Sequence, residues 1–323
     1  MNFTHLKEIS ASSPVLVTGH NGFKGTWLVQ ILDFLGIANV GLSLEVEDDS
    51  LYSRCKLPGT RQEFDCDINN FNQVKEIISS VKPSVVFHLA AQPIVSIANN
   101  DPYSTIQTNV MGTLNLLESV RIVGGVKAVG IVTTDKVYRN FDLKSKKFKE
   151  CDELGATEPY GASKAAVEML VQGYRKILEE TVQTKLVALR SGNVIGGGDF
   201  SKDRLMPDMV RARLNSEKLH IRNPESTRPW QHVLDPLFGY LAAIEYCLKS
   251  RTTTHNEFNF GPENENEMTV QDVLEKALGI FPIDYEYSGN KTEQVKQIGN
   301  AVPVNTAKAL ATAILSDPKG SNI

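Results

Sequence analysis

The chain has few cysteines, no long apolar run and no large excess of charge of either sign. Its four cysteines show neither the close pairs of a zinc site nor the spacing of a disulfide framework, which predicts reduced thiols in a cytoplasmic protein and no metal site. They are Cys55, Cys66, Cys151 and Cys247. No run approaches the roughly 18 apolar residues of a membrane span, and the N-terminal stretch contains Glu8 and no apolar segment of signal-peptide length. The sequence therefore predicts a soluble protein without a targeting segment.

The charge balance excludes further classes of partner. Lys and Arg number 34 and Asp and Glu number 38, so the net charge of −4 gives no general attraction to nucleic acid or to an anionic membrane. The one basic cluster, residues 144–149, lies in a polar stretch and is expected to be a solvated loop. A length of 323 residues with 41% hydrophobic residues instead predicts a globular protein of about two domains.

Short apolar runs alternate with helical patterns over the first 190 residues. Strands are expected at residues 15–18, 40–44, 62–65, 84–88, 126–133 and 185–190. Helices are expected at residues 23–35, 71–81, 103–120 and 160–180. This order predicts an α/β fold, in which a doubly wound parallel sheet forms an NAD-binding (Rossmann) domain over residues 1–190. From Ser191 glycines and prolines break the rhythm, so residues 191–280 are expected to form a smaller α/β substrate domain, with some segments returning to the sheet.

A glycine-rich turn lies between the first strand and the first helix. Glycines permit a tight turn and a close approach of the backbone, and the helix N-terminus that follows suits a pyrophosphate. The residues expected to bind a dinucleotide here are Gly19, Asn21, Gly22, Phe23, Lys24 and Gly25. Glu45 is either a ribose ligand or part of a solvated acidic loop. No Arg stands near Ser43 to meet a 2′-phosphate, which favours NAD over NADP.

Two polar clusters follow, one on a helix and one at a strand end. Tyr160 and Lys164 lie one helical turn apart on one face, and the ammonium would favour the phenolate, which lowers the pKa of a tyrosine from its usual value of about 10. Such a pair can take a proton from a sugar hydroxyl while a nicotinamide takes a hydride. The triplet Thr134-Asp135-Lys136 closes a strand, and a surface ion pair is the alternative role for Asp135 and Lys136.

Further residues are expected at the carboxyl edge of the sheet, where ligands lie in such folds. Those at strand ends are Asp67, Ile68, Leu89, Ala90, Ala91 and Gln92. His88 is expected to be a packed or hydrogen-bonded strand-end residue. Asn109 is either a solvent-facing residue of its helix or a residue that orients a proton relay near Lys164.

These motifs resemble the extended short-chain dehydrogenase/reductase superfamily and, within it, the CDP-glucose 4,6-dehydratases. The resemblance covers about residues 14–265. It rests on Val17-Thr-Gly-His-Asn-Gly-Phe-Lys-Gly25, His88-Leu-Ala-Ala-Gln-Pro93, Thr108-Asn-Val-Met-Gly-Thr113, Gly192-Asn-Val-Ile-Gly-Gly-Gly-Asp199 and Arg228-Pro-Trp-Gln-His-Val233. A generic epimerase of the superfamily would share only the first few of these runs.

The resemblance implies NAD-dependent conversion of CDP-glucose to a 4-keto-6-deoxy sugar and water. Tyr160, assisted by Lys164, would take the proton of the 4-hydroxyl, and Thr134 would hydrogen-bond the same oxygen. Asp135 would be the acid that protonates the departing 6-hydroxyl, and Lys136 would be the base that removes H5. Related dTDP-glucose dehydratases place a Glu where this chain has Lys136, and a Lys can act as a base only when it is neutral.

The same resemblance implies substrate contacts, a bound cofactor and an assembly. The residues expected to bind the nucleotide sugar are Gln92, Asn193, Leu205, Pro207, Arg222 and Arg228. Arg228 suits a diphosphate because a guanidinium is a planar two-pronged donor. Asn109 joins the residues expected around NAD, together with Tyr160 and Lys164. A homodimer is expected through the helices at 103–120 and 160–180, with no nucleic-acid or membrane partner.

In the C-terminal segment, residues 281–323, the resemblance changes, because about residues 281–315 resemble a different family. Gln297-Ile-Gly-Asn-Ala-Val-Pro303 is similar to the C-terminal motif of cytosine-5 DNA methyltransferases. None of the four cysteines follows a proline, so the nucleophile of such an enzyme is missing and methylation is not expected. Residues 304–315 have the periodicity of an amphipathic helix, which would either dock on the substrate domain or remain loose.

Three alternative functions stay open at this point. The first two are another nucleotide-sugar 4,6-dehydratase and a 4-epimerase, although an epimerase would not need Asp135 and Lys136 as an acid and a base. The third is an NAD-binding protein whose catalysis is impaired by the exchanged C-terminal segment.

Overall fold

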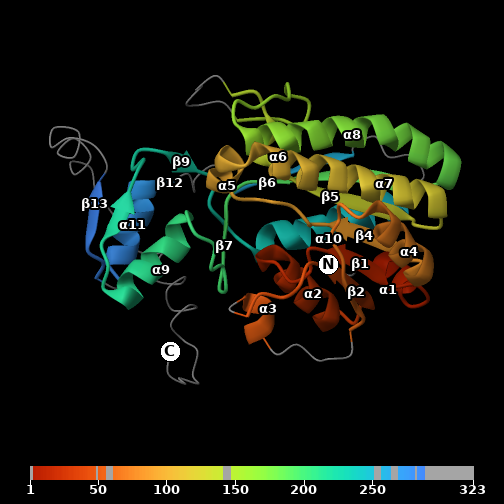
Figure 1. Ribbon diagram of the computed structural model, residues 1–323, viewed down its shortest axis with the longest axis horizontal. Helices are drawn as coiled ribbons and strands as arrows, with labels where there is room; N and C mark the ends of the chain where they lie inside the picture. Colours follow the sequence, from red (N-terminus) through yellow and green to blue (C-terminus); the bar gives the residue numbers. More distant parts are fainter. Residues whose placement is uncertain are drawn as a thin grey trace. The chain divides into compact units, whose positions relative to one another are not determined.

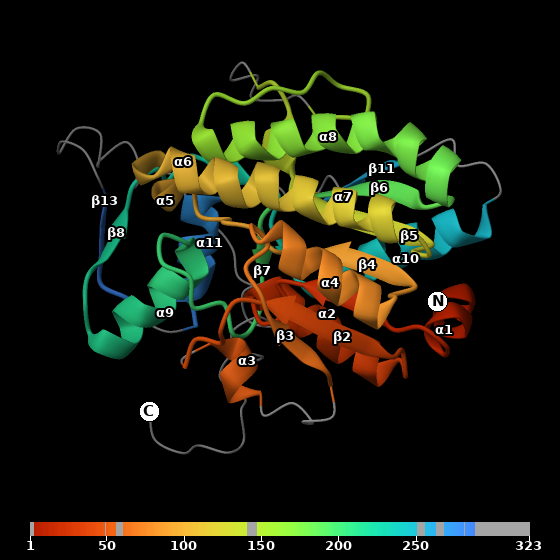
Figure 2. The ribbon, with the colours of Figure 1, turned by 45° about the vertical axis from the view of Figure 1, so that its right-hand side comes forward.

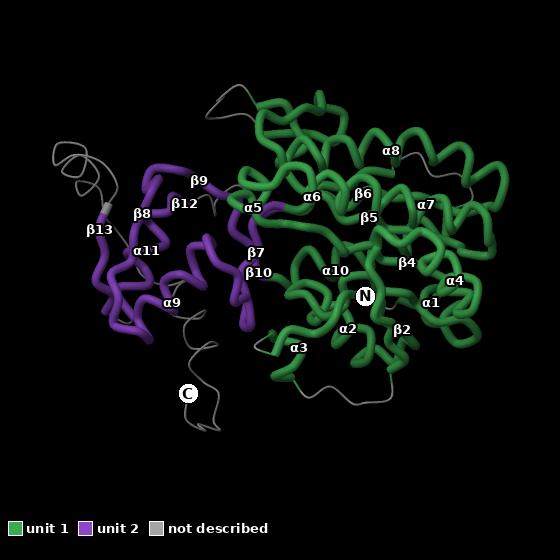
Figure 3. The backbone as a smooth tube through the Cα atoms, viewed as in Figure 1, with its two compact units in different colours: residues 1–191, 233–260 green, residues 192–232, 261–323 purple. Residues whose placement is uncertain are grey.

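The computed structural model describes residues 3–48, 50–55, 61–140, 147–250, 256–262, 268–280 and 282–287. The chain forms two compact units, which Figure 3 colours separately. The first contains residues 1–191 and 233–260, and the second contains residues 192–232 and 261–323.

The first unit is built on a seven-stranded sheet in the order β11-β6-β5-β4-β1-β2-β3, in which every pair is parallel. The strands are β1 (Val15–Thr18), β2 (Asn39–Ser43), β3 (Glu63–Asp65), β4 (Val85–His88), β5 (Ala128–Thr134), β6 (Lys185–Ser191) and β11 (Glu257–Phe260). β1 pairs with β2 on one side and β4 on the other, so the strand order reverses there. Ligands of doubly wound sheets bind beyond the carboxyl ends of the strands at such a point.

Helices cover both faces of this sheet (Figure 1). The longer ones are α2 (Phe23–Phe34), α4 (Phe71–Val81), α7 (Gly112–Val123), α8 (Pro159–Val182) and α10 (Leu234–Lys249). The shorter ones are α1 (Thr4–Ser10), α3 (Leu51–Arg54), α5 (Val95–Asn100), α6 (Pro102–Ile106) and the 3₁₀ turn η2 (Asp135–Val137). Figure 2 shows α4, α7 and α8 side by side along one face, and their apolar side chains share one core with the strands beneath. α2 and α10 pack together against the opposite face.

The strands and helices expected in this unit are present within two residues of their predicted bounds, with one exception. The helix predicted at 103–120 is interrupted by a π-helical turn, η1 (Gln107–Met111), between α6 and α7. The prediction of a single regular helix was therefore wrong. Asn109 lies in this turn with only 1% of its surface exposed, because its side chain is bonded to neighbouring segments.

The second unit has its own small core. Its strands form the pairs β7 (Val194–Ile195) with β10 (Gln231–His232), β8 (Leu219–Ile221) with β13 (Tyr285–Tyr287), and β9 (Thr227–Arg228) with β12 (Met268–Thr269). Two helices, α9 (Leu205–Asn215) and α11 (Val270–Leu278), pack with them around Trp230 and Leu274. α11 begins at a capping box, in which Thr269 and Asp272 bond each other's backbone N–H.

The two units divide the chain differently from the predicted boundaries. Residues 233–260, which form α10 and β11, belong to the first unit and are the segments that return to the sheet. Of the C-terminal segment 281–323, the structure describes residues 282–287, where β13 pairs with β8. The amphipathic helix expected at 304–315 lies outside the described residues. Within the described ranges, no helix is both long enough and apolar enough to span a membrane.

Candidate active site

The glycine turn is held tightly against the end of β4. Gly19 has φ +68°, and a Cβ on it would lie 2.8 Å from the amide nitrogen of Ala90. A Cβ on Gly25 would lie 2.0 Å from the carbonyl oxygen of Gly19. Any side chain at either position would therefore displace backbone. Gly22 is the N-cap of α2 and has no side chain to cap the first turn, so Phe23 begins a helix terminus that suits a phosphate group.

Two other side chains of the turn are engaged within the first unit. Asn21 Nδ2 donates to the carbonyl oxygen of Leu44 at 2.7 Å. Lys24 Nζ donates to Ser191 Oγ at 2.6 Å and to the hydroxyl of Tyr240 at 3.4 Å. Complete burial raises the pKa of Tyr240, so its hydroxyl is neutral. The motif pattern did not single out Tyr240, because it lies on α10, far along the chain.

His88 has the structural role that the sequence predicted. Thr113 Oγ1 donates its proton to the carbonyl oxygen of Asn109 at 2.6 Å, so it can only accept from His88 Nε2 at 3.0 Å. Nδ1 then accepts from Thr18 Oγ1 at 2.7 Å, and the imidazole is neutral. Burial, together with the charge of Lys164, lowers the pKa of His88 to about 3.

The loop after β4 contains three residues predicted to contact the cofactor. The backbone N–H groups of Leu89 and Ala90 both donate to Thr18 Oγ1 at 3.2 Å, and Ala91 follows them in the same loop. The side chain of Gln92, predicted to bind substrate, donates to Thr105 at 2.8 Å and accepts from the N–H of Ile94 at 2.6 Å. These bonds fix the path of the loop.

The pair predicted after β3 separates into one exposed and one buried residue. Asp67 is exposed, and its Oδ1 accepts from the N–H of Asn69 at 2.9 Å. Ile68 is 5% exposed and packs on α7, where a Cβ on Gly112 would lie 2.5 Å from its Cγ2. The carboxylate of Asp67 is therefore accessible after β3, whereas the side chain of Ile68 is taken up by packing.

Tyr160 and Lys164 stand at the start of α8. Glu158 caps this helix, because its carboxylate accepts from the N–H groups of Tyr160 and Gly161 at 2.8 and 2.7 Å. Tyr160 is 9% exposed and Lys164 is 6% exposed. Lys164 Nζ donates to the carbonyl oxygen of Val132 at 3.1 Å. Burial lowers the pKa of Lys164 to about 8, against the opposing attraction of Glu168, so the ammonium still predominates near neutral pH.

The triplet at the end of β5 lies beside this pair. Thr134 Oγ1 donates to Asp135 Oδ1 at 3.0 Å and accepts from the N–H of Lys136 at 3.4 Å. Lys136 Nζ is 5.8 Å from the centroid of the Tyr160 ring. Thr134 is buried, Asp135 is half-buried and Lys136 is exposed. The structure thus brings together a phenol, a hydroxyl, a carboxyl group and an amine that are up to 26 residues apart in the chain.

Asn109 joins the two sides of this cluster. Its Oδ1 accepts from the N–H of Gln92 at 2.8 Å, and its Nδ2 donates to Ser163 Oγ at 2.9 Å. Ser163 Oγ donates in turn to the carbonyl oxygen of Tyr160 at 2.7 Å. Asn109 is therefore not solvent-facing. It connects the loop after β4 with the first turn of α8, next to Lys164.

The residues predicted to contact substrate beyond residue 191 all lie in the second unit. The carbonyl oxygen of Asn193 accepts from the N–H of Gln231 at 3.3 Å. Arg222 is exposed and pairs with Asp203 at 3.2 Å, and Arg228 Nη1 donates to the carbonyl oxygen of Thr227 at 2.8 Å. Leu205 and Pro207 begin α9, where Leu205 packs on the core of this unit and Pro207 is buried.

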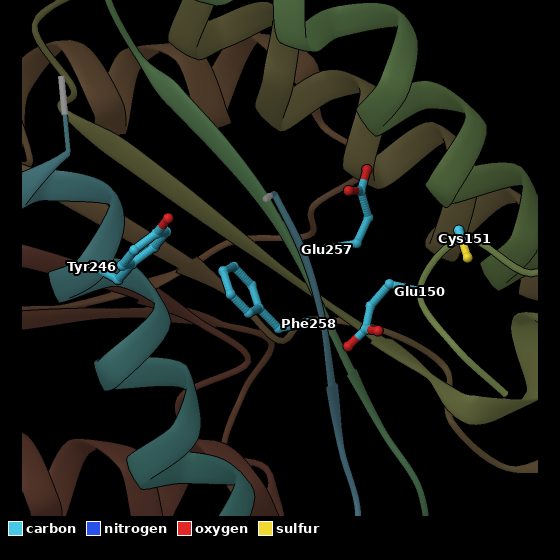
Figure 4. A pocket seen from close by; sticks show the side chains of 5 residues that line it. All are labelled: Glu150, Cys151, Tyr246, Glu257 and Phe258. Carbon is cyan, nitrogen blue, oxygen red and sulfur yellow. The ribbon is translucent and has the colours of Figure 1, made fainter. Parts of the chain in front are cut away.

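A surface pocket of about 500 Å³ lies at the edge of the sheet, beside β11. It is lined by Glu150, Cys151, Tyr246, Glu257 and Phe258. Figure 4 shows Phe258 directed toward Tyr246, with Glu257 and Glu150 on the other side of the strand. None of the predicted site residues lines it, so this pocket is distinct from the cluster around Tyr160.

Comparison with known proteins identifies a family that the chain matches, a relative that is similar in sequence, and solved structures that share its fold. A family model described as GDP-mannose 4,6 dehydratase matches residues 16–313, which include part of the C-terminal segment. The CDP-glucose 4,6-dehydratase of Salmonella typhimurium is 38% identical over 276 residues, which cover 84% of this chain and 77% of that protein. The solved dTDP-glucose 4,6-dehydratase of Bacillus anthracis in complex with NAD has a TM-score of 0.70 and 23% identity, covering 94% of this chain and 96% of that one. The UDP-glucose 4-epimerase of Thermus thermophilus in complex with NAD has a TM-score of 0.72 and 22% identity, covering 94% and 99%.

Proposed function

Because the chain belongs to the GDP-mannose 4,6 dehydratase family, we propose that it is an NAD-dependent hydro-lyase that converts CDP-glucose to CDP-4-dehydro-6-deoxyglucose and water. The choice of CDP-glucose is supported by the 38% identity with a CDP-glucose 4,6-dehydratase. The observation that carries the chemistry is the cluster itself, in which Lys136 and the Thr134–Asp135 pair lie beside the ring of Tyr160.

NAD fits the first unit. The turn around Gly19 and Gly25 leaves no room for a Cβ, as a backbone that must approach a pyrophosphate requires. Asp67 lies at the same edge of the sheet. When bound, NAD supplies the acceptor and later the donor of one hydride.

The side chains of the cluster would move the protons. Tyr160 takes the proton of O4 as the C4–H bond breaks, and the ammonium of Lys164 favours the phenolate that does so. Thr134 hydrogen-bonds the resulting 4-keto oxygen. The ketone acidifies H5, so Lys136, when neutral, removes that proton while Asp135 protonates the departing 6-hydroxyl and water leaves. The hydrogen that left C4 is then added at C6, and a proton is added at C5. The substrate therefore loses only the elements of water.

The remaining contacts and the assembly are part of the proposal. Arg222 and Arg228 suit the diphosphate, and Asn193, Leu205, Pro207 and Gln92 would contact the rest of the nucleotide sugar. A homodimer would bury apolar side chains that are exposed along α6, η1 and α8. These are Tyr103, Ile106, Met111, Met169 and Ile177, which are 39–78% exposed.

The direct test is to incubate the purified protein with CDP-, UDP- and dTDP-glucose and NAD. We expect a 4-keto-6-deoxy sugar, detected by its absorbance in alkali, to form fastest from CDP-glucose. A faster reaction with UDP- or dTDP-glucose would show that the assignment of CDP-glucose as the substrate is wrong. Formation of an epimerised sugar without loss of water would favour the 4-epimerase. The presence of both Asp135 and Lys136 argues against that function.

A further inference from the structure

A buried ion pair joins β6 to α8 behind the cluster. Arg190 Nε donates to Glu168 Oε1 at 2.9 Å and Nη2 donates to Oε2 at 2.8 Å. The two side chains are 1% and 0% exposed. A two-pronged contact fixes both groups in orientation, and loss of either partner would leave a buried charge unpaired. Glu168 lies one helical turn beyond Lys164 on α8, so this pair is close to the predicted chemistry.

The carboxylate also holds the end of β5. Thr133 Oγ1 donates to Glu168 Oε1 at 2.6 Å, and Lys164 Nζ donates to the carbonyl oxygen of Val132 at 3.1 Å. Two residues of α8 therefore bind the two residues that precede Thr134. Because Tyr160 lies in the first turn of the same helix, these bonds fix the position of Thr134 relative to Tyr160.

The guanidinium holds the chain that follows Lys136. Arg190 Nη1 donates to the hydroxyl of Tyr138 at 2.8 Å and to the carbonyl oxygen of Glu150 at 2.9 Å. The Tyr138 hydroxyl donates to Asn259 Oδ1 at 2.6 Å, on the edge strand β11. The loop after Lys136 is thus tied to β6 and β11, and Tyr138 is the residue through which both bonds pass.

We propose that Glu168, Arg190 and Tyr138 are positioning residues. They act through two separate sets of hydrogen bonds, or arms. The arm from Glu168 to Thr133 aligns Thr134 with Tyr160 for the oxidation at C4, and the arm from Arg190 to Tyr138 holds Lys136 where it can remove H5. This inference rests on the proposed dehydration. It assigns the Tyr138 hydroxyl to one chemical step, because Tyr138 follows Lys136 by two residues and lies outside α8, the helix that contains Tyr160.

Tyr138→Phe is the probe of the second arm. It deletes one hydroxyl and keeps the ring, which stacks on Phe148 with centroids 4.8 Å apart and an angle of 6°. It also leaves the bonds between Arg190 and Glu168 intact. We expect the elimination of water to slow by about tenfold or more, as a small misplacement of a reacting group does, while the oxidation rate constant is unchanged.

The experiment quenches single turnovers of CDP-glucose with the NAD-loaded enzyme and identifies the sugars by mass. With Tyr138→Phe, the 4-keto hexose that retains its 6-hydroxyl should accumulate and then decay slowly. Thr133→Val, which deletes the hydroxyl of the first arm, should instead slow the appearance of this species. A uniform loss of rate in both steps for Tyr138→Phe would overturn the assignment of separate arms.

Thr184→Val is the matched control. It removes one buried hydroxyl, which donates to the carbonyl oxygen of Val126 at 2.7 Å near the opposite end of β6. Like Tyr138→Phe and Thr133→Val, it should lower the melting temperature. It should leave the ratio of the rate constants for oxidation and for elimination unchanged. The affinity for NAD, measured by calorimetry, should be equal in all variants. If wild type makes no keto sugar, the proposed function fails. If wild type does and Tyr138→Phe eliminates water at the wild-type rate, only this inference fails.

Discussion

At the scale of single residues, the proposed chemistry depends on the phenol of Tyr160 and the ammonium of Lys164, which are 9% and 6% exposed. Because the pKa of Lys164 is lowered to about 8 and not further, its charge persists near neutral pH beside Tyr160. Tyr160→Phe keeps the ring but removes the proton acceptor, so we expect turnover to fall by about 10²-fold or more. NAD should remain bound, as measured by calorimetry. Turnover within about tenfold of wild type would contradict the role of Tyr160.

Lys136 differs from Lys164 in being exposed, and its predicted role is confined to one step. Lys136→Ala should still allow oxidation at C4, whereas loss of water should slow by about 10²–10⁴-fold because H5 has no base. Quenched reactions analysed by mass would then contain the 4-keto hexose with its 6-hydroxyl retained. Lys149→Ala, an exposed lysine of the neighbouring loop, serves as the control and should react normally. Dehydration by Lys136→Ala at the wild-type rate would mean that another group is the base.

At the scale of elements, neutral His88 ties β1 and β4 to α7 through Thr18 and Thr113. Its folded pKa of about 3 lies below the unfolded value of 6.5, so between these values the unfolded chain binds a proton that the folded protein does not. This contribution to stability is complete above about pH 6.5 and is lost as the pH falls, by about 2 kcal/mol between pH 7 and pH 5.

The measurement is the free energy of unfolding of wild type and His88→Asn across this pH range. Asn does not titrate, so the variant should be less stable at pH 7 but should lose less stability on acidification. Groups common to both proteins cancel in the difference. Parallel curves for the two proteins would show that His88 is not the group responsible.

The sequence predicted those elements whose causes are local. Continuous apolar runs identified β1, β4, β5 and β6, and the glycine turn and the Tyr160–Lys164 spacing follow from backbone geometry. The π-helical turn at Asn109 could not be predicted, because its reason is a set of bonds to Gln92 and Ser163, which are distant in the chain. In the same way, nothing in the sequence marks Arg190 as more than the end of a strand.

At the scale of the whole molecule, the sequence shows where the alternation of strands and helices ends. It does not show which later segment returns to the sheet of the first unit. The composition changes at Ser191, yet residues 233–260 belong to the first unit because β11 pairs in parallel with β6. That pairing joins residues almost 70 positions apart and has no local signal. The family match extends through residue 313, so it includes most of the segment in which a sequence motif resembles another family.

Assembly is the remaining property at this scale, and the exposed apolar residues of α8 make it testable. Met169, 52% exposed on α8, would be buried in the proposed homodimer, and a carboxylate placed there would meet its symmetric copy or apolar surface. Met169→Glu should therefore raise the dimer dissociation constant by at least about tenfold in sedimentation experiments. Phe34→Glu, which changes an 88% exposed residue of α2, should leave the dimer intact. A Met169→Glu protein that stays dimeric would place the interface on another surface, and a monomeric wild type would refute the homodimer.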